Sequence, residues 1–307
     1  MKSLPDLSVE LAGLTLKNPV MTASGTFGYG EEYADYIDLS KIGAIVVKGL
    51  SLEPRPGNPP PRIVETASGL LNTIGLQNIG VKVFVKEKLP RLRRFEVPII
   101  ANVYGETVEE YREVSEILTE SGGCAALEIN ISCPNVKKGG LSFGLDPDAA
   151  AEVTREVKRV TDLPVVVKLS PQVMNISEMA RAVEAAGADA ISLINTILGM
   201  AVDIHTRRSR LSRVMGGLSG PAIKPIALRL VWEAVRAVSI PVIGIGGIAT
   251  AQDAIEFLIV GARAVQVGTA NFVDPQAIEK IIEGLRGYLA QKGLGSVKDI
   301  IGTFEGE

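Results

Sequence analysis

Short apolar runs recur along the chain, and each begins in one of two ways. One set of runs follows a proline and the other follows a glycine, and the two sets alternate strictly from the N-terminus to the C-terminus. Their length and their content of Val and Ile are typical of buried strands. The pattern therefore predicts eight strands, at residues 19–23, 43–48, 98–102, 123–130, 164–168, 187–195, 241–245 and 261–268.

Helical patterns lie between these runs, and several of them follow a Ser, Thr or Asp that is suited to cap a helix. The expected helices span residues 107–120, 147–160, 176–186, 222–238, 251–258 and 275–289. Apolar strands that alternate with helices indicate parallel β/α units. Eight such units favour a closed (β/α)8 barrel, the TIM barrel, over the alternative of an open, doubly wound sheet.

Two segments fall outside this repeat. Residues 7–17 alternate around Ala12-Gly13 and predict a short N-terminal hairpin. A long insertion follows the second strand, begins with the proline-rich residues 54–61 and contains Asn72. Insertions at the carboxyl-end rim of a barrel often cover the site. No linker or shift in composition divides the chain, so we expect a single domain over residues 1–307.

Charge and composition narrow the range of partners. A net charge of -3 and a pI near 5.5 disfavour binding to nucleic acid or to an anionic membrane. Cys124, Cys133 and His205 are too few to ligate an iron-sulfur cluster or zinc, so no metal site is expected. The N-terminus lacks the apolar core of a signal peptide, and the longest uncharged run, 237–252, is interrupted by Pro241 and glycines. We therefore expect a cytoplasmic protein without a membrane segment.

Polar residues and glycines gather where the predicted strands end. In a parallel barrel the carboxyl ends of the strands meet around the ligand site. Buried cations and amides must be paired, so this concentration indicates a ligand cavity rather than a core. The residues concerned are Ala23-Ser24-Gly25, Lys48-Gly49, Asn102, Asn130, Lys168, Asn195-Thr196, Gly246-Gly247 and Gly268-Thr269.

The stretch from Glu128 to Asn135 combines a buried strand with an unusual loop. The expected strand runs over 126–131, and Asn130 within it needs up to four hydrogen-bond partners, which a polar ligand or network would supply. Cys133 follows in the loop and can act as a nucleophile or base once its thiol ionises. The alternative interpretation is a buried structural cysteine beside a strand-end turn.

Residues 244–249, Gly-Ile-Gly-Gly-Ile-Ala, loosely fit a Rossmann dinucleotide motif. The strand that follows does not end in the acidic residue that would hold a ribose hydroxyl. In a barrel, the same glycines and the Gly268-Thr269 turn would offer backbone N–H groups to a phosphate. A phosphorylated ligand or cofactor is therefore expected.

The cationic residues leave several roles open. Lys48 and Lys168 could form a Schiff base, contact a phosphate or stabilise an anionic ring, and the first role would make the protein an aldolase-type lyase. The basic segment from Arg207 to Arg213, with His205 beside it, is expected to be an exposed loop. A lid or a partner-docking surface is the alternative for this segment.

Six motifs together resemble the class 1 dihydroorotate dehydrogenases, and within them the NAD-linked branch, class 1B. The resemblance covers essentially the whole chain and implies an FMN-binding TIM barrel that oxidises dihydroorotate to orotate in pyrimidine biosynthesis. The motifs are Asn-Pro-Val-Met-Thr-Ala-Ser-Gly-Thr-Phe-Gly at 18–28, Lys48-Gly, Leu-Asn-Thr-Ile-Gly-Leu-Gln-Asn at 71–78, Ile-Ser-Cys-Pro-Asn at 131–135, Gly-Leu-Ser-Gly-Pro-Ala-Ile-Lys-Pro at 217–225 and Gly-Ile-Gly-Gly-Ile at 244–248.

The resemblance also implies roles for individual residues. Cys133 would be the base that removes the C5 proton of dihydroorotate while hydride passes from C6 to the flavin. Membrane-bound relatives use serine in its place and carry an N-terminal extension, and this chain has neither feature. The implied FMN contacts are Ser24, Lys48, Gly49, Asn102, Asn130, Lys168, Ile194, Gly220, Gly246, Gly247, Gly268 and Thr269. The implied substrate contacts are Lys48, Asn72, Thr73, Ile74, Gly75, Leu76, Asn130, Asn135, Asn195 and Thr196.

Electron transfer to NAD needs a second protein, because this chain has neither the cysteines for a cluster nor a convincing NAD motif. The resemblance implies a partner subunit that carries FAD and a [2Fe-2S] cluster, in a heterotetramer built on a homodimer of this chain. The fumarate-linked soluble class 1A is the alternative. A flavin-free barrel lyase and a non-catalytic metabolite-binding barrel are less favoured.

Overall fold

The structure, a computed structural model, describes residues 4–132 and 141–306. Eight parallel strands form its central sheet, in the order β3-β16-β15-β10-β9-β8-β7-β4. Val and Ile dominate these strands, and nearly every residue in them is buried, as expected for strands covered on both faces. The strands are β3 Val20–Thr22, β4 Ile45–Val46, β7 Ile99–Val103, β8 Ala126–Asn130, β9 Val165–Lys168, β10 Ala190–Leu193, β15 Val242–Ile245 and β16 Ala264–Val267.

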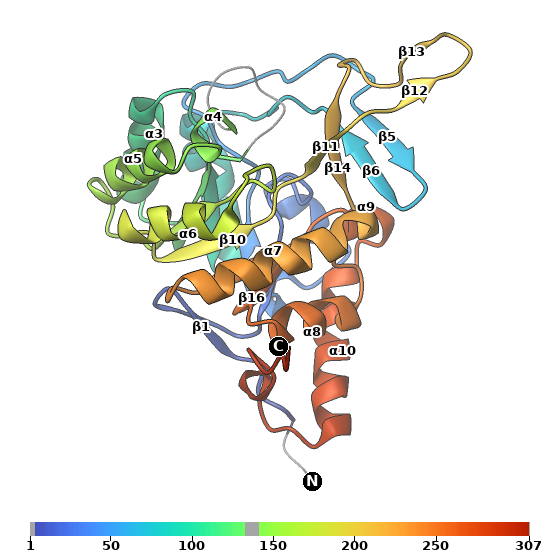
Figure 1. Cartoon of the computed structure of the whole chain (residues 1–307). Coiled ribbons are helices and arrows are strands. Elements are labelled where there is room, and N and C mark those ends of the chain that lie inside the picture. The colour runs from blue at the N-terminus through green and yellow to red at the C-terminus, as the bar shows by residue number, and fades with distance from the viewer. Residues whose placement is uncertain (1–3, 133–140, 307) are drawn as a thin grey trace.

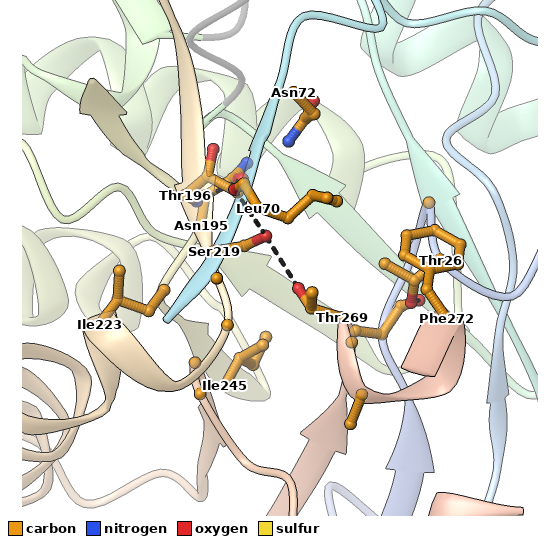
Figure 2. Close-up of a pocket in the computed structure, with 18 of the residues that line it drawn as sticks. Thr26, Leu70, Asn72, Asn195, Thr196, Ser219, Ile223, Ile245, Thr269 and Phe272 are labelled. Atoms are coloured by element: carbon orange, nitrogen blue, oxygen red, sulfur yellow. Dashed lines mark hydrogen bonds between the residues drawn. The ribbon is translucent and has the colours of Figure 1, made fainter. Parts of the chain in front are cut away.

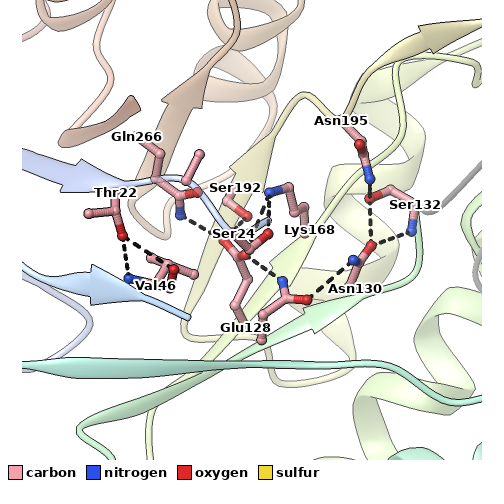
Figure 3. Close-up of polar contacts among 12 residues, drawn as sticks. Thr22, Ser24, Val46, Glu128, Asn130, Ser132, Lys168, Ser192, Asn195 and Gln266 are labelled. Carbon is pink, nitrogen blue, oxygen red and sulfur yellow. Dashed lines mark hydrogen bonds and ion pairs between the residues drawn. The ribbon is translucent and has the colours of Figure 1, made fainter. Parts of the chain in front are cut away.

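The first and last strands of this order meet and close the barrel. Met21 and Ala44 form a parallel bridge between β3 and β4, and Thr22 N donates to Ala44 O at 3.2 Å. The buried Thr22 hydroxyl accepts from Val46 N at 2.8 Å and donates to Val46 O at 3.2 Å (Figure 3). The predicted closed barrel is thus confirmed and the open sheet is excluded, although the ladder of β4 is shorter than the predicted 43–48.

Helices surround the barrel (Figure 1). Four begin at a side-chain cap, in which Thr107, Asp146, Asn175 or Thr250 accepts a hydrogen bond from a backbone N–H of the first turn. These caps explain why the sequence pattern located the helix starts well. The longer helices are α3 Val108–Glu120, α5 Pro147–Lys158, α6 Ile176–Ala185, α7 Lys224–Ala237, α8 Ala251–Ile259 and α10 Ala277–Lys292.

The sequence pattern missed the helical segment before β7. It is a composite of α1 Val81–Val83, the π-helical turn η3 Phe84–Lys88, α2 Leu89–Leu92 and the 3-10 turn η4 Arg93–Phe95. Pro90 has no backbone N–H to donate, which breaks the regular hydrogen-bond series and obscures the helical period. Short turns complete the fold: η1 Glu31–Tyr33, η2 Leu39–Lys41, α4 Leu141–Gly144, η5 Pro221–Ile223, α9 Ala270–Val273 and η6 Val297–Asp299.

Two insertions at the carboxyl end of the barrel combine into one antiparallel sheet, with the order β11-β14-β6-β5. Strands β5 Ile63–Thr66 and β6 Gly69–Asn72 come from the insertion after the second barrel strand, and β11 Ile197–Gly199 and β14 Gly216–Ser219 come from the insertion after the sixth. Figure 1 shows this small sheet above the barrel. Rim insertions were predicted, but their pairing across more than a hundred residues was not.

The predicted N-terminal hairpin is present. Strands β1 Val9–Leu11 and β2 Leu14–Leu16 pair antiparallel, and Ala12 and Gly13 make the turn with φ of 50° and 82°. The hairpin lies at the opposite end of the molecule from the small sheet (Figure 1). The carboxyl end of the barrel is therefore the end that remains available for a site.

Candidate functional site

A cavity of about 710 Å³ lies at the carboxyl ends of the barrel strands, next to the small sheet. Its volume falls in the range that encloses a small-molecule ligand or cofactor. Figure 2 shows Ile245 of β15, Thr269 after β16, and Leu70 and Asn72 of β6 around this space. The barrel and the insertions thus contribute together to one pocket.

All of the residues that were expected to contact the cofactor line this cavity. Of the described residues expected to contact substrate, only Thr73 does not line it: Thr73 is buried and its hydroxyl accepts from Asn58 Nδ2 at 3.2 Å. Cys133 and Asn135 lie outside the described residues. The cavity therefore gathers residues from strands far apart in the sequence, while their binding roles stay predictions.

A buried carboxylate, Glu128 of β8, lies beneath the cavity floor and was not singled out from the sequence. One of its oxygens, Oε1, accepts from Asn102 Nδ2 at 2.7 Å and lies 3.6 Å from Lys168 Nζ. The other, Oε2, accepts from Ser192 Oγ at 2.9 Å and from Gln266 Nε2 at 2.7 Å (Figure 3). A carboxylate can only accept hydrogen bonds, and here three donors and one ammonium, from four other strands, surround it. The signal that could have revealed it is a charge in the middle of an apolar run.

A chain of amides leads from this carboxylate toward the mouth of the barrel. Asn102 Oδ1 accepts from Asn130 Nδ2 at 3.3 Å, and Asn130 Oδ1 accepts from Ser132 N and Oγ at 3.3 and 3.0 Å. Ser132 Oγ in turn accepts from Asn195 Nδ2 at 3.0 Å (Figure 3). Glu128 and Asn130 are two residues apart on one strand, so their side chains point to the same side of the sheet. These side chains form a continuous polar line, called the amide line below, that involves strands β7 and β8 and the loops after β8 and β10.

The buried Lys168 lies beside this line. Its side chain is 5% exposed, and its ammonium donates to Ser24 Oγ at 3.3 Å besides facing Glu128. Lys48 also lines the cavity, at the end of the second barrel strand. Two lysines beside an amide-rich surface suit a ligand that carries or develops negative charge.

The other part of the cavity is bounded by glycine turns. Gly220, Gly246 and Gly247 have φ of 93°, 130° and 72°, which side-chain-bearing residues rarely adopt. A Cβ at Gly247 would lie 2.8 Å from Lys224 N and 3.0 Å from Gly220 O, so only glycine permits these two turns to approach. Thr269 Oγ1 donates to Ser219 Oγ at 2.8 Å across the same region (Figure 2). Narrow glycine turns of this kind suit a phosphate.

The basic segment from Arg207 to Arg213 is largely exposed, as expected, and Arg208 and Ser209 within it form a short strand. It belongs to an exposed arm in which β12 Val202–Asp203 pairs antiparallel with β13 Arg208–Ser209. The carboxylate of Asp203 accepts from the backbone N–H groups of His205 and Thr206, which shapes the turn. His205 is exposed and lies outside the cavity lining.

The thiol of Cys124 is buried at the start of β8, and burial raises its pKa to about 12. It therefore stays protonated at neutral pH and cannot serve as a thiolate base. Among residues 4–132 and 141–306, no group of three or more His, Cys, Asp or Glu side chains could hold a metal ion. Within the same ranges, none of the helices has the length and apolar character needed to cross a membrane.

Comparisons with known proteins agree with this architecture. The family model for dihydroorotate dehydrogenase matches residues 6–289. A relative from Geotalea uraniireducens, named dihydroorotate dehydrogenase B (NAD(+)), catalytic subunit, is 61% identical over 97% of this chain and 98% of its own length. A relative of the same name from Geobacter sulfurreducens is 60% identical over 98% of this chain and 99% of its own.

A solved structure supports the fold. The dihydroorotate dehydrogenase of Eimeria tenella, crystallised with ferulenol, superposes with a TM-score of 0.84 over 98% of this chain and 89% of its own, at 24% identity. That level of identity bears on the barrel architecture alone. The family match and the identity of about 60% to full-length relatives decide the assignment: the chain belongs to the dihydroorotate dehydrogenase family.

Proposed function

We propose that this chain oxidises dihydroorotate to orotate in pyrimidine biosynthesis, with FMN held in the barrel cavity. The observation that carries the proposal is a single cavity that joins glycine turns to a surface of amides, over the buried ammonium of Lys168. Glycine turns suit the phosphate of a mononucleotide, whereas amides suit the donor and acceptor edges of pyrimidine-like rings. The family membership supports the same reaction.

The residues of the cavity fit FMN. The volume is sufficient for a mononucleotide, and Gly246 and Gly247 line the cavity at φ values that side-chain-bearing residues rarely adopt, where neighbouring atoms leave no room for a Cβ. Bound FMN would supply the two-electron acceptor that the oxidation requires. The proposed FMN contacts are those of the resemblance, Ser24, Lys48, Gly49, Asn102, Asn130, Lys168, Ile194, Gly220, Gly246, Gly247, Gly268 and Thr269, and all of them line the cavity.

The protein's own side chains would divide the remaining work. Lys168 would stabilise negative charge that develops on a ring bound in the cavity, because its ammonium is desolvated and already oriented. Asn72, Asn130 and Asn195 would orient the substrate through hydrogen bonds to its ring. Cys133 is proposed as the base, and Ser132 immediately before it is held by hydrogen bonds with Asn130 and Asn195.

A visible spectrum of the purified chain, recorded anaerobically before and after addition of dihydroorotate, tests the reaction. We expect a bound flavin that dihydroorotate bleaches. A colourless chain that FMN cannot reconstitute, or a flavin that dihydroorotate leaves oxidised, would contradict the proposal. Borohydride trapping of a lysine with the substrate would instead favour a lyase.

Replacement of Cys133 tests the proposed base. Cys133→Ala should keep bound flavin and slow its reduction by dihydroorotate by roughly 100-fold or more, because general base catalysis contributes about that much. Cys124→Ala is the matched control, since its thiol is buried and protonated, and reduction should remain near the wild-type rate. Equal rates in the two variants would remove Cys133 from the mechanism.

We further infer the NAD-linked branch, with a partner subunit that carries FAD and [2Fe-2S] in a heterotetramer built on a homodimer of this chain. Relatives at 60 and 61% identity are named as catalytic subunits of the NAD(+) enzyme, and this chain has only two cysteines of its own. Purification with the co-expressed flavin and iron-sulfur subunit should yield NAD-linked activity. A chain that binds no such subunit and reduces fumarate rapidly would belong to class 1A. The cytoplasmic location stays a prediction.

A further inference from the structure

We propose that Glu128 is a positioning residue of the catalytic site: it sets the direction of the amide line and offsets the charge of Lys168. Glu128 is 0% exposed and does not itself line the cavity, whereas Asn102, Asn130 and Lys168 do. It would therefore act on a bound ligand only through these neighbours. The inference rests on the proposed flavin function and deepens it.

The direction of the amides follows from the chemistry of a carboxylate. Ionised Glu128 can only accept hydrogen bonds, so Asn102 must turn its NH2 group down to it and its Oδ1 toward Asn130. Asn130 must then present its NH2 group to Asn102 and its oxygen to Ser132. An acceptor-only group at one end thus determines which amide atoms are left to meet a ligand in the cavity.

Gln266 gives independent evidence that the carboxylate imposes these orientations. Its Nε2 donates to Glu128 Oε2 at 2.7 Å, while its Oε1 is buried and has no hydrogen-bond partner among the described residues. A buried oxygen without a partner is unfavourable, so the gain from the charge-assisted bond must outweigh that cost. The hydrogen bond to Glu128 therefore decides how the Gln266 amide lies.

The second proposed role of Glu128 is to offset the positive charge of Lys168. Lys168 Nζ lies 3.6 Å from Glu128 Oε1, and both side chains are almost fully removed from water. Replacing the carboxylate with a neutral group would leave a buried positive charge that is no longer offset, in contact with the ligand cavity. Such a charge would favour the reduced, more negative form of a bound flavin over the oxidised form.

The variant Glu128→Gln separates these effects from simple loss of packing, because glutamine has the same shape. Asp189→Asn is the matched control: it also neutralises a carboxylate paired with a lysine, 2.8 Å from Lys158 Nζ, but at the amino ends of the strands. Both proteins and the wild type are loaded with FMN. The midpoint potential of the flavin is then measured, together with the affinity for orotate from the change that orotate causes in the flavin spectrum.

For Glu128→Gln we expect the ratio of reduced to oxidised flavin at a fixed potential to rise at least tenfold, which is about 30 mV for a two-electron couple. We also expect orotate to bind at least tenfold more weakly, because the amide line loses its fixed direction. Asp189→Asn should change neither quantity. The proposal would be overturned if a folded Glu128→Gln variant stayed within twofold of the wild type in either quantity. A fall in the midpoint potential, or an equal shift in Asp189→Asn, would also overturn it.

Glu128→Asp covers the case in which Glu128→Gln fails to fold. It keeps the charge but draws the carboxylate back by one methylene, so the potential should stay near that of the wild type while orotate affinity falls. Unchanged orotate affinity in this variant would overturn the proposed control of the amides. If dihydroorotate bleaches wild-type flavin but the variants behave as wild type, only the role of Glu128 is lost; if the wild type never binds FMN, the proposed function fails as well.

Discussion

Two lysine–carboxylate pairs lie toward opposite ends of the barrel, and they differ in burial. At the amino ends, Lys158 and Asp189 are 2.8 Å apart and their side chains are about one-third exposed. At the carboxyl ends, Lys168 and Glu128 are 3.6 Å apart and their side chains are 5% and 0% exposed. Water screens the first pair, so its loss costs little. The second pair has lost its hydration, so each partner depends on the other. Burial, rather than distance, ranks these two interactions.

The same contrast extends to the two ends of the barrel. The amino ends carry a partly exposed ion pair and the buried thiol of Cys124, whose raised pKa keeps it protonated at neutral pH. At the carboxyl ends, buried amides and a buried ion pair border a cavity. The buried ion pair of Lys168 and Glu128 therefore lies at the end where a ligand can use its charge.

The largest expected effect is on folding. Glu128→Ala removes the acceptor for three hydrogen-bond donors and leaves Lys168 buried without its counter-charge, so the free energy of unfolding should fall by about 3–5 kcal/mol. Urea titration of the flavin-free protein measures this loss. The double variant Glu128→Ala/Lys168→Met should recover part of it. A loss below about 1 kcal/mol would mean that the buried pair is no more important than an exposed one.

Next in size is the effect of Lys168 on the reaction. Lys168→Met keeps most of the apolar stem but removes the ammonium, and reduction of the flavin by dihydroorotate should slow by roughly 100-fold or more, as for loss of one oriented electrostatic group. Lys158→Met at the amino end is the control and should stay within about twofold of the wild-type rate. Anaerobic stopped-flow absorbance measures both. Similar slowing in both variants would contradict a special role for the carboxyl end.

A smaller effect concerns Cys124 and pH. Burial raises its folded-state pKa from about 9.0 to about 12, so the folded thiol stays protonated while the unfolded thiol ionises. The stability that this thiol contributes is complete below about pH 9 and is lost between about pH 9 and 12, with a slope of about 1.4 kcal/mol per pH unit.

Cys124→Ala removes this titration, so the difference in unfolding free energy between wild type and variant should shrink from pH 8.5 to pH 10.5. Urea unfolding at the two pH values measures it, and the other titrating groups cancel because both proteins share them. A difference that stays constant with pH would show that the folded thiol ionises as freely as the unfolded one.

The smallest effect is expected for the partly exposed pair of Lys158 and Asp189. Asp189→Asn should lower the free energy of unfolding by no more than about 1 kcal/mol, because the pair is partly hydrated and asparagine can still accept from Val165 N. Urea unfolding measures this loss in the same way as for Glu128→Ala, so the two losses in unfolding free energy can be compared directly. A loss as large as that of Glu128→Ala would show that burial does not distinguish the two ends.

Local patterns accounted for most of the barrel. Residues such as Thr107 and Asp146 cap helices through atoms a few positions away, so the sequence locates those helix starts. The composite helix around Pro90 escaped prediction because its hydrogen-bond series is irregular. The small sheet escaped because Leu71 pairs with Leu218, and sequence patterns do not specify partners at that separation.

The candidate site divides in the same way. Asn130 and Lys168 could be recognised from the sequence because each ends a strand, and the carboxyl ends of parallel strands meet at one end of the barrel. A charge within an apolar run marks Glu128 as unusual, but its partners could not be predicted, because they come from four other strands that only the closed barrel brings together. Thr73 matched a motif by position, but its side chain turns away from the cavity to Asn58.

By itself, the sequence determined the order of the β/α units, the end of the barrel that carries polar groups, and the family, because these depend on periodicity and on residues that are neighbours along the chain. Only the tertiary structure decided which polar groups are paired, which are buried and which face the cavity. Hydrogen bonds and desolvation act between atoms that are close in space, so their balance around Glu128 and Lys168 exists only once the barrel has closed.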